Sequence, residues 1–153
     1  MANATETVVE RELVIAATPQ TVWELLVDPE QASAWMGLQS WSDPTPGGVY
    51  RVEVIPGKIA SGEYIELDPP NRLVFTWGWE DDGNAVPAGS SRIEFELTAD
   101  GDGTHVRFVH SGLPSAEAAG SHARGWDHYF ERLEIAARGG DAGTDLWVTG
   151  EMS

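Results

Sequence analysis

Two histidines are the side chains of this sequence best suited to moving protons near neutral pH. His110 ends a segment of alternating polarity, and His122 lies on the apolar stripe of a later helical segment. An imidazole titrates close to physiological pH, so His110 could act as a general acid or base in a pocket, as could Tyr129. A histidine that is hydrogen-bonded to a loop carbonyl is the commoner finding. Acid–base catalysis is therefore one hypothesis, and a purely structural histidine is the other.

Other catalytic chemistries lack the residues that they require. The chain has no cysteine, which excludes disulfides, thiolate nucleophiles and cysteine-ligated metals. No two histidines have the i, i+4 spacing of a helical zinc site, and the Asp-Gly-Asp-Gly sequence at 100–103 indicates a hairpin turn rather than a calcium loop. Neither a G-x-S-x-G elbow nor a nucleotide-binding glycine motif is present. We expect no metal and no cofactor, and we favour a binding protein over an enzyme.

The charge balance and the first residues limit the expected partners and location. Nine basic residues stand against 25 acidic ones, which gives a net charge of −16. Nucleic acids and anionic membranes both attract clustered Lys and Arg, so we expect neither as a partner. Residues 1–7 lack the basic and apolar regions of a signal peptide, and no apolar run reaches the roughly 20 residues that cross a bilayer. We therefore expect a cytoplasmic protein, either a monomer or a homodimer.

The elements that position these residues follow from periodicity and turn signals. Residues 8–16 are rich in β-branched side chains and predict a first strand, after which Thr18 and Pro19 begin a helix that continues to Val27. Asp28 ends that helix and can begin a short second one that continues to Trp35. Turn sequences rich in Pro, Gly, Asp and Asn then separate five further predicted strands, near 49–55, 58–67, 72–79, 91–98 and 104–111.

A long helix is predicted for residues 115–138, where the apolar period changes from two to about 3.6. Its apolar stripe carries the bulky side chains Trp126, Tyr129 and Phe130. Gly120 and Gly125 interrupt the helix, each at a cost of about 1 kcal/mol relative to alanine. Glycine at that cost predicts a close approach of the backbone to the sheet, to the first helix or to a ligand.

This order of elements predicts an α+β fold in a single domain. A run of antiparallel strands followed by one helix places the helix across one face of the sheet. A sheet of about six strands twists, and its curvature around the helix leaves a concavity between the two. We place the domain at residues 7–139, with tails at 1–6 and 140–153 that are either flexible or docked. The second tail carries Leu146, Trp147 and Val148, which could dock or add an edge strand.

Five segments in order resemble the AHSA1-like (activator of Hsp90 ATPase homologue) family of the Bet v1-like, START-related superfamily. The resemblance covers roughly residues 7–138 and is carried by 22–29 with Trp35, 47–51, 62–77, 104–114 and 125–129. It implies a helix-grip fold, in which the curved sheet grips the long C-terminal helix over a hydrophobic cavity. The superfamily includes lipid and hormone carriers, polyketide cyclases and a co-chaperone, so the fold does not select one function.

The cavity implied by this fold is the predicted binding site. An apolar cavity with a few polar groups is the usual form of a small-molecule site, although ordinary core packing is the alternative for each aromatic residue singly. The predicted ligand-binding residues are those expected to face the concavity from the sheet or the helix: Trp35, Tyr50, Val52, Phe75, Trp77, Phe108, His110, His122, Trp126, Tyr129 and Phe130.

Three functions remain as hypotheses. The first is binding or sequestration of an apolar small molecule in the cavity. The second is a cyclase or dehydratase that acts on a polyketide-like substrate in the same cavity. The third is a module that acts on the Hsp90 chaperone, as the family resemblance implies; the eukaryotic co-chaperone relies on an additional N-terminal domain that we do not expect here.

Overall fold

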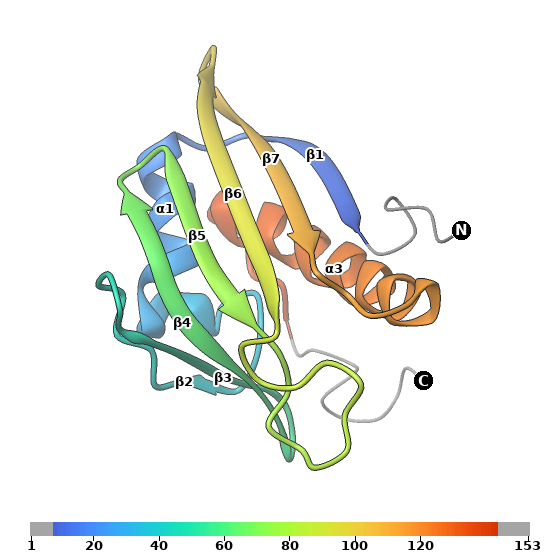
Figure 1. Cartoon of the computed structure of the whole chain (residues 1–153). Coiled ribbons are helices and arrows are strands. Elements are labelled where there is room, and N and C mark those ends of the chain that lie inside the picture. The colour runs from blue at the N-terminus through green and yellow to red at the C-terminus, as the bar shows by residue number, and fades with distance from the viewer. Residues whose placement is uncertain (1–7, 144–153) are drawn as a thin grey trace.

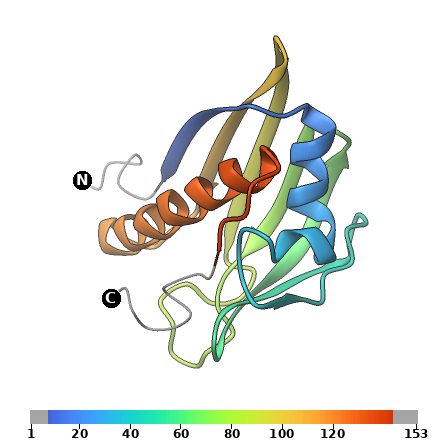
Figure 2. The ribbon, with the colours of Figure 1, turned by 180° about the vertical axis from the view of Figure 1, so that it is seen from behind.

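A curved antiparallel sheet of seven strands wraps around one face of a long helix in the computed structural model of this chain, which describes residues 8–143 (Figure 1). Figure 2 shows the same arrangement from behind, with the two main helices on the concave face of the sheet. The predicted α+β helix-grip fold is thereby confirmed. The elements follow in the order β1 (Val9–Ile15), α1 (Pro19–Val27), α2 (Pro29–Ala32), β2 (Gln39–Ser40), β3 (Val49–Ile55), β4 (Lys58–Asp68), β5 (Arg72–Trp77), β6 (Ser91–Asp100), β7 (Gly103–Ser111) and α3 (Ala116–Ala137).

The three helices of the described residues begin at the capping residues that the sequence indicates. The Thr18 hydroxyl accepts a hydrogen bond from the Thr21 amide, and the Ser115 hydroxyl accepts one from the Ala118 amide. Asp28 caps α2 through the Glu30 amide. Each cap satisfies an amide that has no partner within its own helix. The helices therefore start where short polar side chains precede proline or an apolar stripe.

The second helix is shorter than predicted, because it ends at Ala32 instead of continuing to Trp35. Ala34 and Trp35 donate their amides to carbonyls three residues earlier, which tightens the chain into turns. The Trp35 indole also donates to the Leu25 carbonyl at 2.7 Å, so the side chain turns back toward α1. Gly37 follows with a φ of +89° and redirects the chain into β2.

The strands join in the order β1-β7-β6-β5-β4-β3-β2, all antiparallel. The seventh strand, β2, is only two residues long and was not predicted. The predicted strand 72–79 ends as a continuous strand at Trp77, and beyond it Trp79 forms an isolated antiparallel bridge with Ala60. There the amide of Ser61 donates to the Gly78 carbonyl, and the amide of Trp79 donates to the Val86 carbonyl. Loop 78–90 thus folds back against the start of β4.

Alternation along the strands gives the sheet one apolar, buried face and one polar, solvent-exposed face. Ile93, Phe95 and Leu97 on β6 are buried, and so are Val106 and Phe108 on β7. The predicted inward register of both strands is thus confirmed. These inner faces meet α3, whose buried side chains are Ala119, Trp126, Tyr129, Phe130, Leu133 and Ala137.

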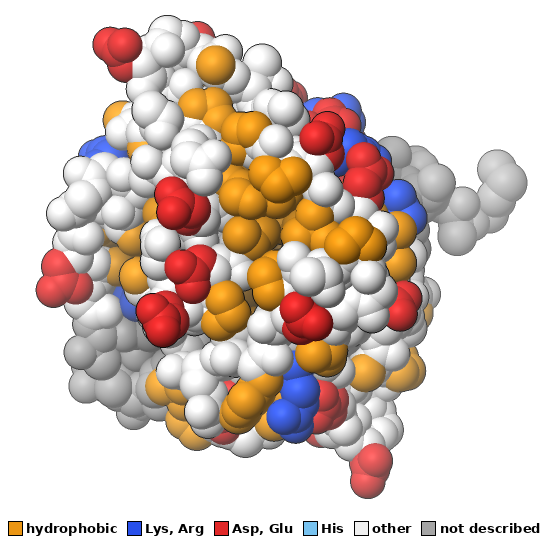
Figure 3. All heavy atoms as spheres, turned by 90° about the vertical axis from the view of Figure 1, so that its left-hand side faces the viewer, with side chains coloured by type: hydrophobic (Ala, Val, Ile, Leu, Met, Phe, Trp, Pro, Cys, Tyr) orange, Lys and Arg blue, Asp and Glu red, His pale blue; other side chains and the backbone are white. Residues whose placement is uncertain are grey.

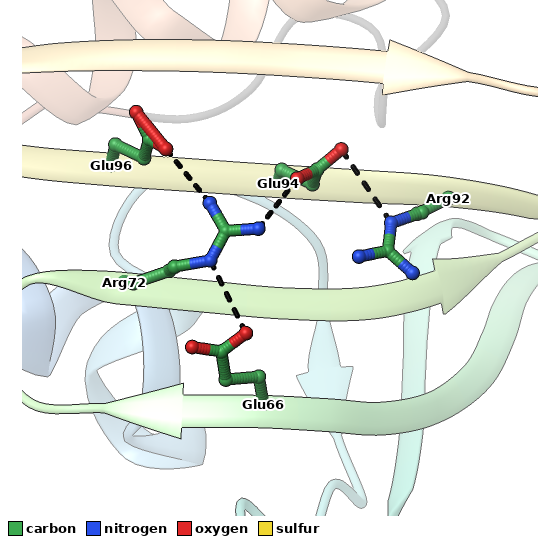
Figure 4. A network of polar contacts seen from close by, with 5 residues as sticks. All are labelled: Glu66, Arg72, Arg92, Glu94 and Glu96. Carbon is green, nitrogen blue, oxygen red and sulfur yellow. Dashed lines mark hydrogen bonds and ion pairs between the residues drawn. The ribbon is translucent and has the colours of Figure 1, made fainter.

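The outer face of the sheet carries a network of ion pairs (Figure 4). The Arg72 guanidinium on β5 lies 2.8 Å from the carboxylates of Glu94 and Glu96 on β6 and 3.2 Å from that of Glu66 on β4. Such solvated pairs contribute little to stability. Elsewhere on the surface, Asp and Glu side chains are more widely spread than Lys and Arg on the face shown in Figure 3. The acidic excess is therefore carried by solvated side chains.

Gly120 lies in open space, so the predicted close approach is wrong for this glycine. A Cβ atom added there meets only Nη1 of Arg124, at 3.8 Å. We expect Gly120→Ala to raise the free energy of unfolding by about 1 kcal/mol in urea denaturation, because alanine loses less backbone entropy in a helix. As a contrast, a Cβ at Gly62 would clash with the Thr76 carbonyl oxygen, so Gly62→Ala should destabilise the protein. A destabilised Gly120→Ala variant would contradict this interpretation.

No helix within residues 8–143 is long and apolar enough to span a membrane. The predicted tail residues Leu146, Trp147 and Val148 lie outside the described residues, and the boundaries of the domain at 7 and 139 stay predictions.

Candidate functional site

A pocket of about 590 Å³ opens at one end of the molecule, between the first half of α3, the hairpin of β3 and β4, and loop 78–90. Aromatic rings form much of its wall: Trp77 and Trp79 from the sheet side, and Trp126 and Tyr129 from α3. Aliphatic side chains and the thioether of Met36 complete the apolar lining, namely Met36, Val54, Ile55, Ala85, Val86 and Ala118. The pocket is therefore a concave, predominantly apolar site of a size that suits a small organic molecule.

The charged groups of the pocket lie at its rim. Lys58 and Glu117 are the charged side chains among the described lining residues, and both are exposed. Lys58 also faces Asp81, with 3.5 Å between Nζ and the carboxylate. The polar rim continues with Asn84, Ser115 and Ser121. A charged ligand group would thus find a partner only near solvent, while the deeper wall suits an uncharged one.

Four of the predicted ligand-binding residues line this pocket: Trp77, His122, Trp126 and Tyr129. Gly125 also lines it, so the backbone of α3 is part of the pocket wall at that glycine. Whether these residues contact a ligand stays a prediction. The structure brings them together because β5, loop 78–90 and α3 converge at this end of the sheet.

Four other predicted residues, Trp35, Tyr50, Val52 and Phe75, lie outside that pocket. They border a separate void of about 20 Å³, which is close to the space that one water molecule needs. The rings of Tyr50 and Phe75 stack with their centroids 4.2 Å apart, and both side chains are buried. In this structure these residues therefore fill the core rather than border space for an organic ligand.

Phe108 and Phe130 border neither void. Their ring centroids lie 4.9 Å apart with an interplanar angle of 79°, and each ring also contacts Trp126. Edge-to-face and offset packing of this kind stabilises an aromatic core. These two rings support Trp126 from behind, so they shape the pocket only indirectly.

His110 is fully buried and uses both ring nitrogens. Its Nδ1 atom accepts a hydrogen bond from the Trp126 indole at 3.1 Å, so the ring proton resides on Nε2. Nε2 then donates to the Ser91 hydroxyl at 2.8 Å, and that hydroxyl donates to the Trp77 carbonyl at 2.7 Å. Burial, together with the neighbouring His122, lowers the pKa of His110 to about 3. The imidazole is therefore neutral and structural, with a hydroxyl and an indole as partners in place of the expected loop carbonyl.

His122 lies beside His110, with 5.1 Å between the ring centroids, as the sequence suggested. Its Nδ1 atom is 2.9 Å from the Ala118 carbonyl oxygen and must donate to it, which leaves Nε2 as an acceptor. Nε2 accepts the indole N–H of Trp79 at 3.1 Å. Burial lowers the pKa of His122, and the bond to the Ala118 carbonyl opposes that effect. His122 is thus a neutral imidazole in the pocket wall.

Trp77 carries a buried polar atom for which the described residues provide no hydrogen-bond partner. Its side chain is 2% exposed, and Nε1 makes no hydrogen bond within residues 8–143. An unsatisfied buried donor costs about 1–3 kcal/mol. The ring packs against Trp126 and Trp79, with centroid distances of 5.1 Å and 5.4 Å. Ring packing, and not a hydrogen bond, therefore positions this indole in the pocket wall.

Sequence reasoning missed the contribution of loop 78–90 to the pocket. Periodicity predicts a strand over 72–79 and a turn sequence before the strand at 91–98, so Trp79 is absent from the predicted ligand-binding residues. The available signal was Val86, an apolar residue within the polar segment 81–90, which proves to be 2% exposed.

No group of three or more His, Asp or Glu side chains suited to a metal ion occurs among the described residues.

Comparison with known proteins places this fold in a family. Residues 16–138 match the family described as activator of Hsp90 ATPase homolog 1-like protein. The AHSA1-like protein RHE_CH02687 from Rhizobium etli is 45% identical, with a TM-score of 0.72 over 90% of this chain and 86% of that one. No curated protein matches the chain.

Two further solved structures share the fold. DynU16, a protein in the dynemicin biosynthetic locus, is 25% identical, with a TM-score of 0.76 over 91% of this chain and 50% of that one. The Aha1 dimer from Colwellia psychrerythraea is 18% identical, with a TM-score of 0.72 over 85% and 95% of the two chains, and shows likeness of fold alone. The family match over most of the chain and the relative at 45% identity show that this chain belongs to the activator of Hsp90 ATPase homolog 1-like family.

Proposed function

We propose that this protein binds an uncharged, largely apolar aromatic small molecule in the pocket between α3, the β3–β4 hairpin and loop 78–90. The observation that carries the proposal is the pocket itself, which has a volume of about 590 Å³ and walls made of three indoles and a phenol ring. Indole and phenol rings favour stacking and edge-to-face contact with other flat rings. The position of the charged side chains at the rim supports an uncharged ligand.

A binding role is also supported by the state of the two histidines. His110 makes its two hydrogen bonds to Ser91 and Trp126 and does not line the pocket. Burial depresses the pKa of both imidazoles, which holds them in the neutral form near pH 7. These features favour a structural role for His110 over acid–base chemistry. The relation to DynU16, from a biosynthetic locus, further supports a small molecule over a protein partner.

The proposal is tested by thermal unfolding of the purified protein with uncharged polycyclic aromatics, sterols and fatty acids, together with native mass spectrometry. A ligand at 100 times its dissociation constant should add about 2.7 kcal/mol to stability. We expect flat aromatics to stabilise the protein more than fatty acids do. If no member of these classes shifts the transition or appears in the native mass spectrum, the proposed function is wrong.

A pair of variants on α3 locates the binding. Ser121 lines the pocket at the rim, so the indole of Ser121→Trp should occupy part of it and weaken binding about tenfold, which corresponds to about 1.4 kcal/mol. Arg124 is exposed on the same helix and does not line the pocket, so Arg124→Trp should bind within about twofold of the unmodified protein. Equal affinities of the two variants, measured by isothermal titration calorimetry, would place the ligand elsewhere.

A further inference from the structure

The side chains of Trp79 and His122 meet in the pocket wall, where they form a hydrogen bond with each other. Trp79 comes from loop 78–90 and His122 from α3, 43 residues later in the chain, and both side chains are only partly buried. The contact is the 3.1 Å hydrogen bond from the indole Nε1 to the imidazole Nε2. Both residues line the pocket, so a ligand can reach the bond that joins them.

The direction of this hydrogen bond is fixed by the groups around it. An indole nitrogen can only donate. Nδ1 of His122 donates to the Ala118 carbonyl, so Nε2 is held as an acceptor. A group that separates the two atoms must therefore accept from Trp79 and donate to His122 at the same time. A hydroxyl does both, whereas an ether, a ketone or a carboxylate only accepts and an ammonium group only donates.

The Trp79 side chain can move away from His122 without loss of its backbone contacts. The Trp79 amide donates to the Val86 carbonyl at 2.8 Å, and the next amide, that of Glu80, donates to the Ile59 carbonyl at 2.9 Å. These bonds hold the chain at the base of loop 78–90 independently of the indole. The comparable Trp126–His110 contact is different, since His110 is fully buried and does not line the pocket.

We propose that Trp79 and His122 together form a subsite for a hydroxyl group on the aromatic ligand: the hydroxyl inserts between them, accepts the indole N–H and donates its proton to Nε2 of His122. This inference rests on the proposed function and specifies its ligand as a hydroxylated aromatic. One hydrogen bond is exchanged for two, with no covalent change. The gain of one net hydrogen bond corresponds to about a 3- to 10-fold preference for the hydroxylated ligand.

The test measures the dissociation constants of 2-naphthol, 2-methoxynaphthalene and naphthalene by calorimetry. We expect the unmodified protein to prefer 2-naphthol over 2-methoxynaphthalene about 3- to 10-fold. His122→Phe should reduce that preference to within about twofold while naphthalene still binds, because the acceptor for the ligand hydroxyl is lost and an aromatic ring is kept. Trp79→Phe should keep most of the preference, since the hydroxyl can still donate to His122. Comparing ratios between variants removes differences in how water solvates the probes.

The outcomes separate this inference from the function on which it rests. If none of the three probes binds, the proposed function fails and the subsite fails with it. If naphthalene and 2-methoxynaphthalene bind as well as 2-naphthol does, or if His122→Phe keeps the full preference, the pocket binds aromatics and the subsite is wrong.

A measurement on the unmodified protein guards against variants that do not fold. The indole N–H resonance of Trp79, assigned by its loss in the Trp79→Phe spectrum or by sequential assignment, should move more with 2-naphthol than with 2-methoxynaphthalene at saturation. Equal shifts with both probes would overturn the subsite even if no variant could be purified.

Discussion

Lowering the pH from 7.5 to 5 should destabilise this protein by about 2 kcal/mol more than it destabilises the His110→Gln variant. The pKa of His110 is about 3 in the folded protein, whereas an unfolded histidine titrates near 6.5. Above pH 6.5 both states hold a neutral ring and the stability does not depend on this proton. Below pH 6.5 the His110 ring binds a proton in the unfolded chain and stays unprotonated in the folded chain. The free energy of unfolding therefore falls as the pH falls.

The physical cause is the closed hydrogen-bond chain around His110. Protonation would place a proton on Nδ1, where the Trp126 indole already donates, and would put a charge in a fully buried position. Glutamine carries both a donor and an acceptor but no titratable group, so His110→Gln should lower stability at pH 7.5 and flatten its dependence on pH. Urea denaturation at several pH values measures both effects.

The control for this experiment is His105→Gln. The side chain of His105 is 38% exposed on the outer face of the sheet, with Nε2 3.0 Å from a Glu12 carboxylate oxygen, so its removal takes away a histidine outside the core. A change in pH dependence that appears in His110→Gln and not in His105→Gln would be assigned to the buried ring. Parallel curves for His110→Gln and the unmodified protein would show that His110 is not held neutral.

Trp126→Ala should lower the free energy of unfolding by about 3–5 kcal/mol, the range for loss of a buried tryptophan. The Trp126 ring is 3% exposed and lies between the sheet and α3. Its centroid is 4.9 Å from that of Phe108 and 5.1 Å from that of Trp77. Alanine would leave a cavity in the pocket wall and would remove the donor to Nδ1 of His110. Urea denaturation monitored by circular dichroism measures the loss.

Two further variants divide this effect into its parts. Trp126→Phe keeps most of the packing and removes the hydrogen bond, so it should destabilise by about 1–3 kcal/mol. Trp41→Ala removes a tryptophan that is 43% exposed and lies beside Arg51, and it should change stability by no more than about 1 kcal/mol. If Trp126→Ala were no more destabilised than Trp41→Ala, the ring would not have the central place in the core that the structure gives it.

Much of the fold could be predicted from the sequence because local patterns act over short distances. Thr18, Asp28 and Ser115 cap the helices, as short polar side chains before an apolar stripe indicate. Alternation along β6 and β7 identified the inner face of the sheet correctly. Where the predictions were wrong, tertiary contacts decided the result. The second helix ended early beside the bond from Trp35 to the Leu25 carbonyl, and β5 stopped where loop 78–90 turned back.

By itself the sequence determined which faces are apolar, where the helices begin and which family the chain resembles. Only the tertiary structure decided which aromatic residues border open space and which fill the core. Tyr50, Phe75 and Trp77 all face inward, yet only Trp77 lines the large pocket. The reason is that periodicity gives the direction of a side chain, while the distance across to α3 depends on sheet curvature and on where each strand ends. The same holds for the pairing of Trp79 with His122, because a contact between residues 43 apart exists only once loop 78–90 and α3 have been packed together.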